Sequence, residues 1–307
     1  MIGLLRFSNS ILCKKEVLGK NYECEIAGIK TRIYFPQYPQ VDDANPQIGM
    51  LNPLLAPEIG KCFKDPDDHS FWGEPMSHPD GNSSVNKIVV SVECDKTQTY
   101  EIASKLYKEF EKWTYSFITH LMLQTKQNLE RNRNESEVAF LQLFEDKNIP
   151  NITPLTISII IPNEASFASE SQIKNAILFA NSGKELLLEY QMLLSAYGAI
   201  QQNQNRRAIM DACSAFELAL VNYIDQYCLS KGIPPEILID KYRSLGERIK
   251  LTRKLDTKFP QKDYIKLVVE PRNSLMHNKC VFPTEETTNN LITCVEELLS
   301  YFYSSYY

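Results

Sequence analysis

The pattern of apolar residues changes near Pro162, and this change constrains the fold more than any other feature of the chain. Before it, short stretches alternate between apolar and polar residues, as strands with one buried face do. After it, apolar residues recur every three or four positions up to the carboxyl end, which is the spacing of amphipathic helices. We therefore predict an α+β domain over residues 1–168 and an all-α helical bundle over residues 169–307.

The first domain carries the signature of a β-hairpin. Apolar and polar residues alternate over residues 22–26, Ala27 and Gly28 offer a turn, and the alternation resumes over residues 29–35. The other elements expected here are a strand over 88–94, a helix over 102–121, a short segment around Phe140 and a strand over 155–161.

Residues 36–86 interrupt these elements with a stretch rich in Pro, Asp, Asn and Gly. Proline has no amide proton to donate, so this stretch predicts a long loop. Because the first domain is attached to a bundle that can bury its own core, we interpret residues 1–168 as a sensing or regulatory domain.

The second domain is expected to contain only helices. The helical patterns run over residues 172–179, 185–200, 206–227, 235–255, 263–277 and 284–303. The second and third patterns can also form one long helix, because residues 201–205 contain neither Gly nor Pro.

Charge and cysteine usage limit where such a protein acts. A formal net charge of -5 disfavours a surface coated with positive charge for bulk nucleic-acid binding, so any such contact must be local. The eight cysteines are scattered without a Cys-x-x-Cys pair, as in proteins of a reducing compartment. Residues 1–18 do not resemble a signal peptide, and no stretch approaches the ~20 apolar residues that span a bilayer. We expect a cytoplasmic protein without membrane contact.

The segment from Pro271 to His277 places a cation, an amide and an imidazole in one short stretch. Arg272 can bind a phosphate through its planar guanidinium, and His277 can transfer protons near neutral pH. The pair therefore indicates phosphate chemistry. The alternative is a solvated arginine and a histidine that caps a helix.

Helix geometry restricts how these residues meet. Asn273 and His277 are four residues apart and share a face, whereas Arg272 precedes His277 by five residues, a rotation of about 140°. Pro271 favours the first turn of a helix that the motif opens. Either this helix starts irregularly at Arg272, or Arg272 and His277 pair with those of a second chain.

Glu217 is the candidate acidic partner of this motif. It shares a helical stripe with apolar residues, where a carboxylate needs a partner. It is either an anchor for Arg272 or His277, or one half of a structural ion pair, and Asp211 is the weaker candidate for the same role. The candidate RNA-contacting residues are Arg248, Lys250, Arg253 and Lys254, which are otherwise an ordinary solvated helix face.

The motif resembles the Arg-x(4–6)-His motif of the HEPN superfamily, in its Arg-Asn-x-x-x-His form. The stretch Arg206–Asn222 is similar to the alanine-rich helix of that superfamily, which bears an acidic residue, and Leu245–Ile249 is similar to the middle of the intervening helix. The resemblance extends over roughly residues 171–307. The fusion of a strand-bearing domain to such a bundle looks most like the ApeA-like branch linked with antiphage defence.

The resemblance implies a metal-independent endoribonuclease without cofactors, which acts as a homodimer through the carboxyl-terminal bundle in bacterial defence or as a toxin. RNA is the implied substrate, and a phage-derived trigger or an antitoxin is a possible further partner. In this interpretation His277 and Arg272 are catalytic, with Asn273 and Glu217 in support. The alternative is a HEPN-like module that only dimerises or binds a ligand or nucleic acid.

Overall fold

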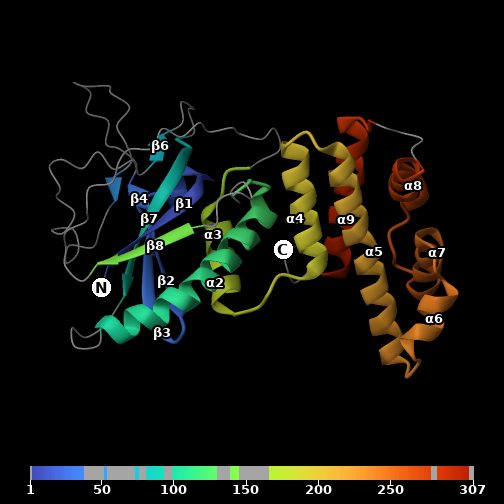
Figure 1. Cartoon of the computed structure of the whole chain (residues 1–307), viewed down its shortest axis with the longest axis horizontal. Helices are drawn as coiled ribbons and strands as arrows, with labels where there is room; N and C mark the ends of the chain where they lie inside the picture. Colours follow the sequence, from blue (N-terminus) through green and yellow to red (C-terminus); the bar gives the residue numbers. More distant parts are fainter. Residues whose placement is uncertain are drawn as a thin grey trace. The chain divides into compact units, whose positions relative to one another are not determined.

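The computed structural model describes residues 2–37, 52–53, 73–75, 81–92, 99–129, 139–144, 166–277 and 282–303 (Figure 1). The chain forms two compact units, Met1–Glu185 and Leu186–Tyr307. The predicted boundary near residue 168 therefore lies inside the first unit, because helix α3 (Glu170–Asn181) packs against helix α2 (Thr99–Thr125). A hydrogen bond of 2.8 Å from Trp113 Nε1 to Asn181 Oδ1 joins these two helices.

A six-stranded antiparallel sheet forms the centre of the first unit. Its strands are β1 (Ile2–Cys13), β2 (Asn21–Ile26), β3 (Ile29–Tyr34), β6 (Gly73–Pro75), β7 (Ser83–Val92) and β8 (Ala139–Phe144). Their order is β2-β3-β7-β1-β8, and β6 pairs with β7. The remaining short elements of this unit are helix η1 (Lys15–Val17) and the strand pair β4 (Pro36–Gln37) and β5 (Asn52–Pro53).

The predicted hairpin is confirmed as β2 and β3. Side chains of β2 alternate between exposed and buried, and Ile26 pairs with Ile29 across the turn. Ala27 and Gly28 both adopt the left-handed conformation, with φ of 56° and 78°, which a two-residue hairpin turn with strand-like twist requires. The predicted strand over 88–94 corresponds to β7, and the segment around Phe140 is β8. The strand predicted over 155–161 lies outside the described residues.

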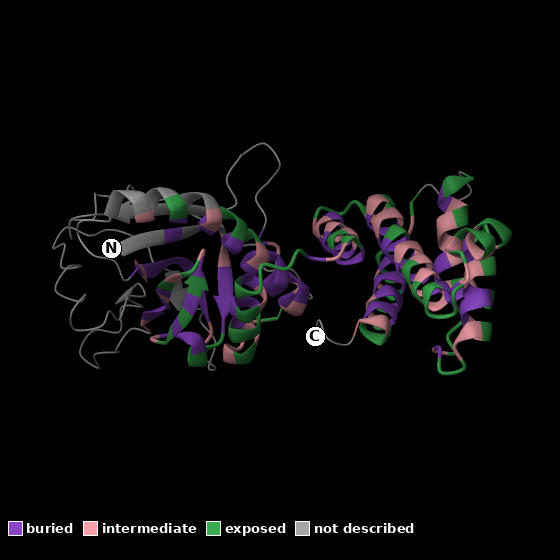
Figure 2. Ribbon diagram, turned by 90° about the horizontal axis from the view of Figure 1, so that it is seen from below, coloured by how far each residue is buried: buried purple, intermediate pink, exposed green. Residues whose placement is uncertain are grey.

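Helix α2 buries the predicted apolar stripe, which includes Leu106, Phe110, Trp113 and Phe117. Figure 2 shows buried residues on both the strands and the helices of the first unit. The helix contacts strands β2 and β8 as well as α3. His120 on the same helix is also buried, with its ring stacked on Phe179 at 4.5 Å between centroids.

The described part of the second unit contains helices but no strand. They are α4 (Leu188–Gln201), α5 (Asn205–Ser230), α6 (Pro235–Lys241), α7 (Leu245–Leu255), η3 (Ile265–Val269), α8 (Glu270–Met276) and α9 (Glu285–Phe302). Helix α5 is the central element, because it contacts α4, α6, α7, α8 and α9. An α+β part followed by a helical part is thus the architecture that the sequence predicted. No described helix is both long and apolar enough to cross a membrane.

Turns interrupt this unit at two places where the sequence allows a longer helix. The chain turns between α4 and α5 at Asn203, which adopts φ of 56°, so the two patterns do not form one long helix. The helix predicted over 235–255 is split into α6 and α7. Ser244 begins α7 with a capping box, in which its hydroxyl accepts from the Glu247 amide while the Glu247 carboxylate accepts from the Ser244 amide.

The buried His120 makes the stability of the first unit depend on pH. Burial lowers the pKa of His120 to about 4, below the value near 6.5 of an unfolded chain. Between these two values the unfolded state binds a proton that the native state does not bind. Lowering the pH from 6.5 to 4 should therefore reduce the free energy of unfolding, by up to about 3 kcal/mol from this group.

The matched test compares the native chain with His120→Gln by urea unfolding at pH 7 and pH 5. Trp113 is buried on α2 in the first unit, so its fluorescence reports the unfolding of this unit. The native chain should lose more stability on acidification than the variant. An equal loss in both proteins would contradict this role of His120.

Candidate functional site

The motif lies in a continuous helix with one wide turn. Residues Ile265–Val269 of η3 are π-helical, and the Glu270 amide donates to the Ile265 carbonyl, five residues back. Val269 has helical φ and ψ of -71° and -44°, so α8 continues η3 without a break. The prediction that the motif opens a helix at Pro271 is therefore wrong, because helical conformation already begins before it. The wide turn gives the proline ring room, because in a regular helix it clashes with the carbonyl four residues back.

Aromatic packing fixes this helix against α5. Tyr264, which precedes η3, is fully buried between Phe216 and Phe259, with ring centroids 5.2 and 5.5 Å away. Cys213 on α5 adds a weak hydrogen bond of 3.8 Å from its thiol to the Val268 carbonyl. Burial raises the pKa of Cys213 to about 12, so this thiol stays protonated and structural.

Glu217 on α5 holds two arginines from different helices. Its Oε1 accepts a short hydrogen bond of 2.5 Å from Arg248 Nη1 on α7. Its Oε2 lies 3.6 Å from Arg272 Nη2 on α8. One carboxylate therefore forms an ion pair with Arg248 and also contacts the arginine of the motif.

Arg272 and His277 leave α8 in different directions. The Arg272 side chain faces α5 and retains 30% of its exposure. His277 ends the helix as an exposed residue, and its amide donates to the Asn273 carbonyl at 3.0 Å. One regular turn thus separates Asn273 and His277, as predicted, and Asn273 is exposed as well. The structure brings Arg272 to Glu217 but does not bring His277 to either.

Asp211 belongs to a separate contact between α4 and α5. It accepts a hydrogen bond of 2.7 Å from the Ser195 hydroxyl, and Arg207 Nε lies 3.5 Å from the same oxygen. This carboxylate therefore joins α4 to α5.

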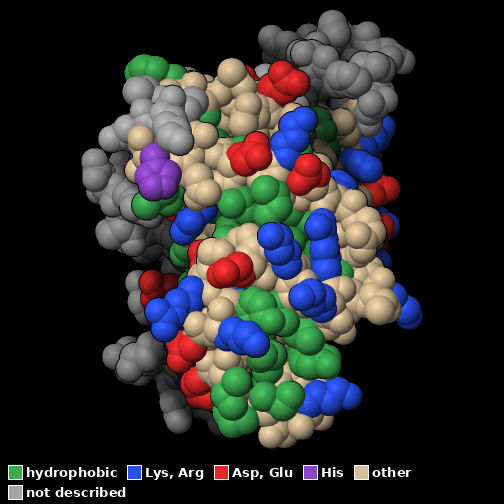
Figure 3. All heavy atoms as spheres, turned by 90° about the vertical axis from the view of Figure 1, so that its right-hand side faces the viewer, with side chains coloured by type: hydrophobic (Ala, Val, Ile, Leu, Met, Phe, Trp, Pro, Cys, Tyr) green, Lys and Arg blue, Asp and Glu red, His purple; other side chains and the backbone are tan. Residues whose placement is uncertain are grey.

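The four candidate RNA-contacting residues divide into two kinds. Arg248 and Arg253 are engaged internally, since Arg253 donates to the Lys262 carbonyl and its guanidinium lies 5.9 Å from the centre of the Tyr264 ring. Lys250 and Lys254 are exposed. Figure 3 shows lysine and arginine side chains gathered on the face over α6, α7 and α8, around exposed apolar side chains. The two lysines are the better candidates for contact with a polyanion.

The sequence carries a start signal for the helix that bears Arg248. Ser244 and Glu247 have the spacing of a capping box, which places the start of α7 after Ser244. With that start, Arg248 lies one turn before Thr252, which is buried, so the two residues share a helix face. Its Nε also donates to the Tyr242 carbonyl at 3.1 Å, a contact that sequence patterns do not reveal.

Comparison with known proteins does not place the chain in a family. No protein-family model matches it, and neither a curated protein nor a solved structure does. The described residues contain no group of three or more histidine, cysteine or carboxylate side chains placed to bind a metal ion.

The effect of a substitution on stability should distinguish an arginine with internal contacts, Arg253, from a surface lysine, Lys254. Arg253→Ala removes the hydrogen bond to Lys262 and the contact with Tyr264, and should lower the free energy of unfolding by about 1–2 kcal/mol. Lys254→Ala, the adjacent control, should change it by less than about 0.5 kcal/mol. Urea unfolding measured by circular dichroism checks both values, and equal effects would contradict the assignment of Arg253 as structural.

Proposed function

We propose that residues 186–307 are a HEPN-like helical bundle and that the protein is a metal-independent endoribonuclease. One observation carries this proposal. A carboxylate on the central helix contacts a half-exposed arginine, Arg272, on the helix that ends with the exposed His277. An arginine that keeps free donors and an accessible imidazole are the groups that phosphate transfer requires.

RNA cleavage by its own 2'-hydroxyl needs a base, an acid and stabilisation of the charged phosphorane. His277 takes the proton from the 2'-hydroxyl and then returns it to the leaving 5'-oxygen. The 2'-oxygen forms a bond to phosphorus, and the bond from phosphorus to the 5'-oxygen breaks. Arg272 stabilises the charge that develops on the phosphate oxygens. The products are a 2',3'-cyclic phosphate and a 5'-hydroxyl.

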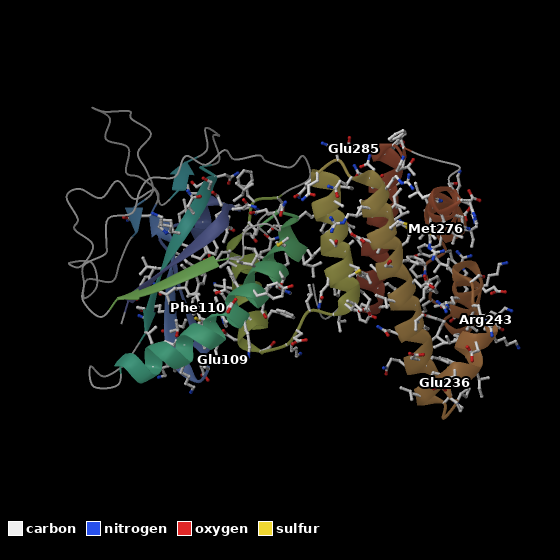
Figure 4. All side chains as sticks on the ribbon, in the orientation of Figure 1. Glu109, Phe110, Glu236, Arg243, Met276 and Glu285 are labelled. Carbon is white, nitrogen blue, oxygen red and sulfur yellow. The ribbon has the colours of Figure 1, made fainter. Side chains whose placement is uncertain are left out.

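Several features support a site completed by a second copy of the chain. Arg272 and His277 diverge by about 140° on a regular helix, and the wide turn lies before Arg272 rather than between the two residues. Met276 and Phe282, on either side of residues 278–281, are 57% and 87% exposed. Met276 lies on α8 at the side of this unit away from α4 (Figure 4). Exposed apolar side chains beside the motif favour a homodimer interface. In such a dimer, each site contains His277 of one chain and Arg272 of the other.

The remaining parts of the proposal concern partners. Lys250 and Lys254 supply local positive charge for RNA on an otherwise acidic protein. The separate sheet-bearing unit fits a sensing role, as in an ApeA-like antiphage-defence or toxin protein restrained by an antitoxin or released by a phage-derived trigger.

The direct test is RNA cleavage in excess chelator. The native chain should cut RNA, whereas His277→Ala should lower the single-turnover rate by about 10²- to 10⁴-fold, because positioned proton transfer contributes that much. RNA with 2'-deoxy substitution at the cleaved position should stay intact, since it has no nucleophile. Gln226→Ala, an exposed change elsewhere on α5, is the matched control and should leave the rate unchanged.

Three results would refute the proposal. They are cleavage that stops in chelator, cleavage undiminished in His277→Ala, and binding of RNA without cleavage. The last result would favour the alternative of a HEPN-like module that only binds nucleic acid.

A further inference from the structure

Arg248 is held at both ends of its guanidinium. Its Nη1 donates to Glu217 Oε1 at 2.5 Å, and its Nε donates to the Tyr242 carbonyl at 3.1 Å. The side chain keeps only 13% of its exposure. The capping box at Ser244 fixes the turn of α7 that carries it. An arginine with a carboxylate and a carbonyl as partners has little freedom left to follow a ligand.

The two contacts of Glu217 are unequal. The bond to Arg248 is a short, charge-assisted hydrogen bond, whereas the 3.6 Å contact to Arg272 is electrostatic. If Arg248 were absent, both carboxylate oxygens could pair with the Arg272 guanidinium in the bidentate geometry that arginine favours. That pairing would occupy the donors that a phosphate needs.

We infer that Arg248 is a positioning residue of the Arg272 site. It holds one oxygen of Glu217, so that the other oxygen orients Arg272 while the remaining donors of Arg272 stay available to a phosphate. The inference rests on the proposed endoribonuclease function. It goes beyond that function because it assigns α7 a part in catalysis through Glu217 instead of a part in RNA binding.

The experiment compares variants of the full chain in two measurements. The single-turnover cleavage rate at saturating RNA should fall by about 10- to 100-fold in Arg248→Gln, as expected when a catalytic group is misplaced. The dissociation constant of uncleavable 2'-deoxy RNA should stay within about twofold, since Arg248 does not contact the RNA. In Glu217→Gln, adding Arg248→Gln should cause no further loss, because Arg248 acts through Glu217.

Lys250→Gln with Lys254→Gln is the matched control for charge on α7. This double variant should weaken RNA binding and lower its salt dependence, as the loss of a direct phosphate contact does. Gln226→Ala, an exposed change on α5 outside the proposed site, should leave the rate at saturation unchanged. A rise in the dissociation constant with an unchanged saturating rate in Arg248→Gln would overturn the inference, because that result marks an RNA contact.

A second measurement does not need activity. The guanidinium Nε–H signal of Arg272 in the NMR spectrum should shift in both Arg248→Gln and Glu217→Gln, and should stay in place in Lys250→Gln. An Arg272 signal that Arg248→Gln leaves unmoved would overturn the positioning role. If the native chain does not cleave RNA, the proposed function fails, and this signal still decides the role of Arg248.

Discussion

The carboxylate of Glu217 is shared by two arginines, and the arrangement of the second unit around its motif depends on this sharing. Arg248 binds it through a short hydrogen bond and Arg272 contacts it electrostatically, so α7 and α8 are both tied to the central helix α5. The two arginines more than balance the negative charge of this partly exposed carboxylate. The cluster of one glutamate and two arginines therefore keeps a net positive charge. In the proposed function, this residual charge stabilises the phosphate.

The contacts that position the helix carrying Arg272 are made by residues that precede the motif in the chain. The buried Tyr264 packs between two phenylalanines, and the π-helical turn after it accommodates Pro271. Both features set the rotation of α8, which directs Arg272 towards α5 and leaves His277 exposed at the end of the helix. A site that needs both residues must then obtain one of them from elsewhere, which is the physical basis for proposing a second chain.

Periodic patterns predicted the two-part architecture, the β2–β3 hairpin and the buried stripe of α2, because each depends on local spacing. Strand β1 was missed, although it lies between β7 and β8, because a register shift between Arg6 and Ile11 breaks its alternation. At the site, helix spacing alone predicted that Arg272 and His277 lie on different faces of the helix and that Asn273 shares a face with His277. Spacing did not predict the Arg248 pair with Glu217, because a contact between α7 and α5 depends on how two helices pack.

The most direct test of this account mixes two inactive variants, Arg272→Ala and His277→Ala, by co-expression. If the site takes Arg272 from one chain and His277 from the other, a mixed dimer contains one intact site, and the mixture should recover about a quarter of native activity. The separately purified variants, never mixed, set the baseline. Activity that stays at this baseline, while mass measurements show that mixed dimers have formed, would contradict a site shared between two chains.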